Sequence, residues 1–262
     1  MSRDVILSVM NVSLSFGGNA VLSNVGFDVD RGQLFAIIGP NGAGKTSLFN
    51  VLTRLYVAQD GRVVFDNEDM SLLAPAQLAG VGIMRTFQNV LVLKGMTVLD
   101  NVMLGLHSNF NVSNVWSAIG LWSARAEERA MRERARDALD IVGLGSMAKE
   151  DAGAVPFGHL RLLELARCIA GQPKMILLDE PSAGMTSEEV DRLMKTLDII
   201  RVRLNPTILL IAHTMKLVMQ VSDRIAVLDH GVKISEGTPN QISEDPAVIE
   251  AYLGKASADA ST

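Results

Sequence analysis

The glycine-rich segment GPNGAGKT, at positions 39–46, constrains the fold of this 262-residue chain more than any other part of the sequence. The apolar run QLFAII precedes the segment, and the helix-forming run KTSLFNVLTRL starts at its last two residues. A continuous apolar run of strand length is typical of a strand covered on both faces. We therefore expect a strand, a glycine loop and a helix in direct succession.

The spacing of this segment matches the P-loop pattern, in which two glycines are followed by lysine and by serine or threonine. Glycines allow successive backbone N–H groups to turn inward and hold phosphate oxygens, and the N-terminus of the following helix adds its dipole. Lys45 can reach the β- and γ-phosphates of a nucleoside triphosphate, and Thr46 can hold Mg²⁺ through its hydroxyl. We expect nucleotide contacts from Gly39, Pro40, Asn41, Gly42, Ala43, Gly44, Lys45, Thr46 and Ser47.

A second apolar run, MILLD, ends in two adjacent acids, Asp179 and Glu180. Two carboxylates at the end of a buried strand are costly unless a cation lies nearby. We expect Asp179 to hold Mg²⁺ through water and Glu180 to orient or deprotonate the attacking water. With the P-loop, this pair predicts a nucleoside triphosphatase.

Strand and helix patterns alternate through much of the chain, which favours a mostly parallel sheet. Thr186 and Glu189 have the spacing of a capping box and predict the start of a helix over 186–204. Ser123 and Gly143 are expected to begin and end another helix, and 229–231 is expected to turn a hairpin. Strands are expected at 5–16, 25–30, 33–38, 61–66, 82–87, 175–179, 206–213, 224–229 and 232–237.

These patterns predict an α/β fold: a P-loop NTPase core of the RecA-like type with a mostly parallel sheet, an antiparallel N-terminal β portion and a helical subdomain insert. We expect one domain over residues 1–262. Its nucleotide-binding core would comprise 1–87 and 171–254, with the helical subdomain at 88–170 and a tail at 255–262.

Composition excludes several classes of protein. A net charge of −5 argues against general nucleic-acid binding, because neutralising phosphates needs a basic face. The N-terminal apolar run is too short for a signal peptide, and no run approaches the ~18 apolar residues of a membrane span. The single cysteine, Cys168, is expected to be a small buried hydrophobe in a reducing compartment.

The segments GPNGAGKT, RTFQ, FGHLRLLELAR, ILLDEPSAG and IAH occur in the order found in ATP-binding subunits of ABC transporters, and the resemblance covers 5–254. In that family, two subunits pair head to tail and sandwich two ATP molecules, each between one P-loop and the other subunit's signature helix. The resemblance implies that Gln88 senses Mg²⁺ and links the site to the membrane subunit. It also implies that His213 contacts the γ-phosphate and that Phe16 stacks on adenine.

The signature pattern of the family is Leu-Ser-Gly-Gly-Gln, and residues 155–159 of this chain depart from it. Gly158 is retained and would let the backbone approach the partner's γ-phosphate, with Phe157 and His159 beside it. Pro156 suits the first turn of a helix but replaces the serine hydroxyl, and His159 replaces glutamine. Met185 stands where the resemblance implies an aspartate, so communication across the dimer is left open.

Three features resemble the branched-chain amino acid branch of this family: RTFQNVLVLKGMTVLDNVMLG, the aromatic residue in PFG, and the ending SEGTPNQISEDPAVIEAYLG. The resemblance implies ATP and Mg²⁺ as cofactors and branched-chain amino acids, urea, amides or aromatic acids as solutes. It implies integral membrane permease subunits, an identical or different second ATP-binding subunit and, indirectly, a periplasmic solute-binding protein as partners. The chain would then be cytoplasmic and peripheral on the inner face of the membrane, with no nucleic-acid partner.

Two alternatives stay open at this point. The chain could serve an exporter or lipopolysaccharide-type system, which shares every catalytic motif. It could also be a DNA-repair or translation ATPase, although a single compact cassette without a basic stripe argues against that class.

Overall fold

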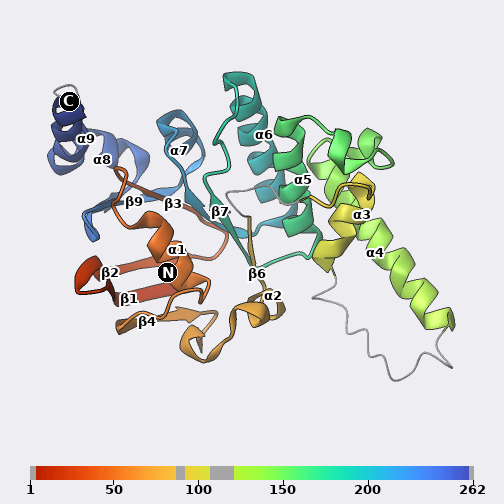
Figure 1. Ribbon diagram of the computed structural model, residues 1–262, viewed down its shortest axis with the longest axis horizontal. Coiled ribbons are helices and arrows are strands. Elements are labelled where there is room, and N and C mark those ends of the chain that lie inside the picture. Colours follow the sequence, from red (N-terminus) through yellow and green to blue (C-terminus); the bar gives the residue numbers. More distant parts are fainter. Residues whose placement is uncertain (1–3, 87–91, 107–120, 260–262) are drawn as a thin grey trace.

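The computed structural model describes residues 4–86, 92–106 and 121–259 and contains two β-sheets (Figure 1). The first sheet is antiparallel, with strand order β2-β1-β4-β5. It comprises β1 (Val5–Phe16), β2 (Asn19–Asp30), β4 (Asp60–Phe65) and β5 (Glu68–Asp69). The antiparallel N-terminal portion predicted from the sequence is confirmed.

The second sheet has the order β10-β9-β3-β8-β7-β6 and is parallel except for β10, which pairs antiparallel with β9 at one edge. Its strands are β3 (Leu34–Ile38), β6 (Ile83–Arg85), β7 (Met175–Asp179), β8 (Thr207–Ile211), β9 (Arg224–Asp229) and β10 (Val232–Gly237). The mostly parallel sheet expected from the alternation of strands and helices is therefore present.

Helices cover both faces of this sheet. The helices of the described ranges are α1 (Lys45–Leu52), α2 (Leu78–Val81), α3 (Val98–Met103), α4 (Leu121–Ile141), α5 (Phe157–Ala170), α6 (Ser187–Leu204), α7 (Met215–Val221), α8 (Pro239–Glu244) and α9 (Pro246–Asp259). Short 3₁₀ turns lie at Met70–Leu72, Pro75–Gln77, Leu104–Leu106, Gly145–Met147 and Ala152–Ala154.

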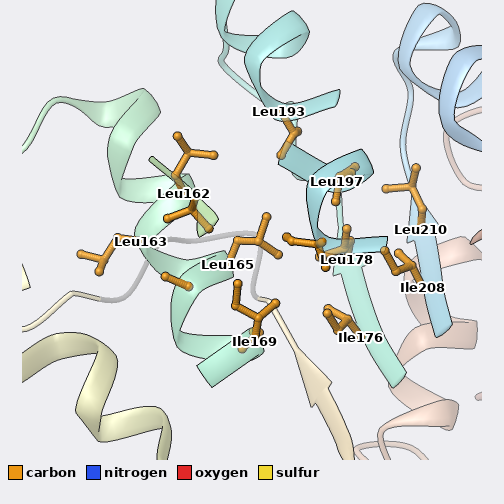
Figure 2. Close-up of a cluster of buried hydrophobic side chains, with 14 of the residues drawn as sticks. Leu162, Leu163, Leu165, Ile169, Ile176, Leu178, Leu193, Leu197, Ile208 and Leu210 are labelled. Carbon is orange, nitrogen blue, oxygen red and sulfur yellow. The ribbon is translucent and has the colours of Figure 1, made fainter. Parts of the chain in front are cut away.

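The alternation of side chains along β3 divides the hydrophobic interior into two cores. Leu34, Ala36 and Ile38 face a cluster shared with α3 to α9, which we call the helix-side core. Phe35 and Ile37 face a cluster shared with α1 and the antiparallel sheet, the P-loop-side core. Figure 2 shows part of the helix-side core, where side chains of α5 and α6 pack against β7 and β8.

Local signals set most of the element boundaries. The Thr186 hydroxyl accepts from Glu189 N, and the Glu189 carboxylate accepts from Thr186 N, so the predicted capping box opens α6. His230 and Gly231 both have positive φ, as a two-residue hairpin between β9 and β10 requires. Gly143, with φ of 77°, follows the end of α4 as predicted.

Two predicted boundaries are wrong. α4 begins at Leu121, so Ser123 lies inside the helix and is not its N-cap. α5 begins at Phe157, so Pro156 is the N-cap residue and lies just before the first turn, with no side-chain cap bond.

Across the described ranges, no helix has both the length and the apolar composition that a bilayer span requires.

Candidate nucleotide site

The P-loop connects the carboxyl end of β3 to the first turn of α1, as the sequence predicts. Lys45 is 5% exposed, and its Nζ donates to the carbonyl oxygens of Gly39 and Pro40, each at 2.8 Å. A Cβ on Gly39 would lie 2.0 Å from the carbonyl oxygen of Leu228, the neighbouring residue on β9. Gly44 precedes α1 with φ of 96°, a left-handed conformation that glycine adopts without strain. Packing and backbone geometry therefore both require these two glycines.

An open pocket of about 320 Å³ lies over the loop. It brings together residues that are far apart in the sequence. The P-loop, Glu180 and His213 each follow the carboxyl end of one of the neighbouring parallel strands β3, β7 and β8. The lining residues are Val21, Asn41, Gly42, Ala43, Gly44, Lys45, Thr46, Ser47, Glu180 and His213. Most of the predicted P-loop contacts and two of the predicted catalytic residues therefore meet in one place.

Glu180 and His213 face each other in this pocket. Nε2 of His213 lies 2.6 Å from Oε1 of Glu180. The parallel pairing of β7 with β8 aligns Asp179 with Ile211, so both side chains follow the ends of adjacent strands. Glu180 has φ of 49°, a left-handed conformation that is uncommon outside glycine and that recurs at functional sites. This backbone turn separates the directions of the two consecutive acids: Glu180 lines the pocket, whereas Asp179 is 3% exposed.

The oxygen donors present fit Mg²⁺ held together with a nucleotide. Asp179 supplies a carboxylate at the end of β7, and Thr46 supplies a hydroxyl in the first turn of α1. Within the described ranges, no group of three or more His, Cys, Asp or Glu side chains could hold a metal ion. Mg²⁺ usually takes one or two protein oxygens and completes its shell with water and phosphate. The donor set therefore matches a metal bound through its nucleotide.

Arg85, at the end of β6, belongs to this region and was not predicted from the sequence. Its Nη2 donates to Oδ2 of Asp179 at 2.7 Å, and its Nη1 donates to Asn50 of α1 and to Thr53, the C-cap of this helix, at 3.0 and 2.8 Å. Nothing within the segment RTFQ indicates these contacts. They depend on β6 lying next to β7, which only the strand order shows.

The start of α5 does not contribute to the pocket over the chain's own P-loop. Phe157, Gly158 and His159 are absent from its lining residues. A Cβ on Gly158 would lie 2.0 Å from Oε1 of Glu189, so within this chain the glycine makes room for α6. Nε2 of His159 lies 3.2 Å from Nη1 of Arg192, also on α6.

The predicted adenine-stacking residue lies outside the lining of the pocket. Phe16 is 47% exposed and meets the ring of Tyr56 edge-on, with centroids 5.1 Å apart. It does not line the pocket, although Val21 of the following strand does. Gln88 lies outside the described residues.

Comparison with known proteins agrees with this geometry. Residues 22–183 match the family described as ABC transporter. The chain belongs to the ABC transporter family. Residues 232–258, from β10 into α9, match a second family described as branched-chain amino acid ATP-binding cassette transporter. The resemblance inferred from the sequence is confirmed.

Named ABC relatives match along nearly the whole chain. A high-affinity branched-chain amino acid transport ATP-binding protein of Pseudomonas aeruginosa, BraF, is 40% identical over 98% of this chain and 100% of its own. The protein LivG of Escherichia coli K12, with the same description, is 38% identical over 96% of this chain and 98% of its own. A solved ATP-binding cassette of an ABC transporter in its ADP conformation superposes with a TM-score of 0.81 at 33% identity, covering 95% of this chain and 99% of its own.

The α/β cassette fold predicted from the sequence is therefore the observed one. As an ABC transporter ATP-binding protein, the chain is an ATPase coupled to transport.

Proposed function

We propose that this ATPase energises an importer of branched-chain amino acids or of a related small polar solute. The convergence of the P-loop, Glu180 and His213 on one pocket carries the proposal for the chemistry. The solute is supported by the names of the BraF and LivG relatives and by the match of the C-terminal segment.

In the proposed reaction, backbone N–H groups of the P-loop bind the β- and γ-phosphates of ATP. Lys45, which donates to two loop carbonyl oxygens, transfers its hydrogen bonds to phosphate oxygens. Glu180 orients the attacking water and accepts its proton, and His213 holds Glu180 and contacts the γ-phosphate. Mg²⁺, when bound, neutralises phosphate charge, and the residues that would hold it are Thr46, Asp179 and Gln88.

The start of α5 acts on the nucleotide of a second cassette. This assignment is supported by the absence of Phe157, Gly158 and His159 from the chain's own pocket and by the exposure of the Phe157 ring. The α5 N-terminus would present its backbone N–H groups to the partner's γ-phosphate. ATP would therefore stabilise a closed pair of cassettes, and hydrolysis would release it. The 88–170 segment would transmit this motion to permease subunits on the cytoplasmic face of the membrane.

Substitution of Lys45 by alanine tests the nucleotide assignment. The change removes a charged donor from the phosphates, and losing about 3 kcal/mol of charge-assisted hydrogen bonding weakens binding about 100-fold. Isothermal titration of the full chain with ATP and Mg²⁺ measures this. Lys174→Ala is the matched control. Lys174 pairs with Asp66 and lies just before the start of β7, at the end of this strand that is away from the pocket. Unchanged affinity in Lys45→Ala would refute the P-loop assignment.

The solute is tested by uptake into cells that carry the complete transport system. Radiolabelled leucine, urea, an amide and an aromatic acid are compared in wild-type and Lys45→Ala strains. We expect the variant to lose ATP-dependent uptake of the transported solute alone. If the uptake of all four compounds is the same in both strains, the proposed solute class is refuted.

A further inference from the structure

The guanidinium of Arg85 joins β6, β7 and α1. It extends from the end of β6, pairs with Asp179 at the end of β7, and donates to Asn50 of α1 and to Thr53, the residue that follows this helix. It also lies over the ring of Phe49, 5.8 Å from its centroid. The parallel register aligns Arg85 with Leu177, so its side chain emerges on the same face as Asp179, towards α1.

The Arg85–Asp179 pair is withdrawn from solvent. The side chains are 11% and 5% exposed, and the separation of Nη2 from Oδ2 is 2.7 Å. A buried ion pair is tolerated when its geometry is good and further hydrogen bonds engage the remaining donors. Here Nη1 of Arg85 donates to both Asn50 and Thr53. Removing one partner of such a pair leaves an uncompensated buried charge, which is strongly destabilising.

We propose that Arg85 is a positioning residue for the metal side of the site: it is the counter-cation of Asp179 and fixes this carboxylate against α1. The inference rests on the proposed function, in which Asp179 holds Mg²⁺ through water. Arg85 engages Oδ2, and Oδ1 is the oxygen that we assign to the metal-bound water. The same guanidinium links β6 to the helix that follows the P-loop.

This role differs from a purely structural one in its dependence on magnesium. Without a metal, the ion pair with Arg85 compensates the charge of the buried Asp179 carboxylate within the part of the chain that the structure describes. When Mg²⁺ is bound with a nucleotide, a second cation compensates the same carboxylate. Loss of the guanidinium should therefore lower the stability of the folded chain more in the absence of Mg²⁺ than in its presence.

Thermal unfolding of the full chain with saturating ADP, in EDTA or in Mg²⁺, tests this expectation without measuring catalysis. In EDTA, Arg85→Met should lower the unfolding temperature by about 10 °C. In Mg²⁺ the loss should be at most half as large. Arg85→Lys retains the positive charge but cannot make all three hydrogen bonds to Asp179, Asn50 and Thr53. It should therefore keep most of the stability that Arg85→Met loses in EDTA.

A second measurement isolates the pair from packing. In an Asp179→Asn background the carboxylate charge is absent, so Arg85→Met should cost less than half of its loss in the wild-type chain. The matched control is Arg224→Met. Arg224 forms a half-buried pair with Glu236 at 2.9 Å, but it begins β9, at the strand end away from the pocket. Its loss should be the same in EDTA and in Mg²⁺.

Equal losses for Arg85→Met in EDTA, in Mg²⁺ and in the Asp179→Asn background would overturn the proposal. If Arg85→Met does not fold, Arg85→Lys and Arg85→Gln in the two backgrounds decide in its place: the proposal requires Gln to be the more damaging, and only while Asp179 is present. A wild-type chain that ADP does not stabilise would instead refute the proposed nucleotide site. The comparison in EDTA with Asp179→Asn would still test the pair.

Discussion

Cys168 shows at the scale of one residue how burial controls reactivity. It lies on the face of α5 that packs into the helix-side core, and it is 5% exposed. Burial, with a smaller contribution from Glu164, raises the pKa of the thiol from its ordinary value of 9.0 to about 12. The stabilising effect of keeping the thiol neutral is complete below pH 9 and is lost as the pH rises from there towards 12.

We therefore expect native protein to resist thiol reagents at pH 8, because only the thiolate reacts and the folded state disfavours it. Reaction with a chromogenic disulfide should be at least 100-fold slower in buffer than in denaturant, where Cys168 is exposed. Absorbance time courses at increasing urea concentration measure this. Rapid reaction of the native chain would show that α5 opens locally far more often than its packing indicates.

The sequence predicted those site residues whose role follows from their immediate neighbours in the chain. Lys45 and Thr46 follow from the glycine spacing, and Glu180 follows from its place after an apolar strand; the pocket contains all three. Arg85 escaped prediction because its partners come from β7 and α1, and no local pattern states that β6 lies next to β7. Phe16 was predicted from resemblance alone, and it lies outside the lining of the pocket.

At the scale of elements, Gly158 couples the start of α5 to the start of α6. Glu189 caps α6 through the backbone N–H of Thr186, and its Oε1 occupies the space that a Cβ on residue 158 would need. Gly158→Ala therefore displaces Glu189 from the capping box, at a cost of about 1 kcal/mol in the free energy of unfolding. In a Glu189→Ala background the obstacle is absent, and alanine should stabilise the helix by up to about 1 kcal/mol.

Urea unfolding of the four proteins in this cycle measures both effects. The expected result is a difference between backgrounds: Gly158→Ala should be about 1 kcal/mol less favourable in the wild-type chain than in the Glu189→Ala chain. The same effect in both backgrounds would show that α5 and α6 are not coupled at this point.

Element boundaries were predictable where capping or turn chemistry is strong. The capping box of α6 and the hairpin after Asp229 form their hydrogen bonds within a few residues of the chain, so the local sequence is enough to predict them. The N-cap at Ser123 was predicted wrongly because a cap is worth only about 1 kcal/mol, which helix propensity and packing readily outweigh. Within the described residues β6 comprises Ile83–Arg85, which align with Met175–Leu177 of β7, and the end of the expected strand at 82–87 lies outside them.

At the scale of the whole molecule, the order of strands in the second sheet could not be read from the chain. Alternation of strands and helices predicted parallel pairing, but it did not predict that β3 lies between β9 and β8, two strands that come much later in the chain. This order brings Glu180 and His213 to the P-loop while α5 begins outside the pocket. One chain therefore supplies the P-loop half of the proposed site, and in the proposed function a second cassette supplies the other half.

The stoichiometry of the closed state tests this division. Glu180→Gln should bind ATP but hydrolyse it slowly, since the residue that accepts the proton from water is lost. With Mg²⁺ and ATP, we expect this variant to double its mass in gel filtration with light scattering, and to remain a monomer without nucleotide. Phe157→Asp in the same background should prevent the doubling, because it places a negative charge beside the partner's γ-phosphate.

Phe157 is 50% exposed and lies outside the chain's own pocket, so the second substitution should leave the ATP affinity of the monomer unchanged, measured at chain concentrations too low for dimerisation. Retained affinity with lost dimerisation would assign the α5 N-terminus to the partner's nucleotide. A Glu180→Gln chain that binds ATP and stays monomeric would instead show that its signature segment, altered at Pro156 and His159, does not serve a second copy. The partner would then be a different cassette, and purification with the permease subunits would recover both.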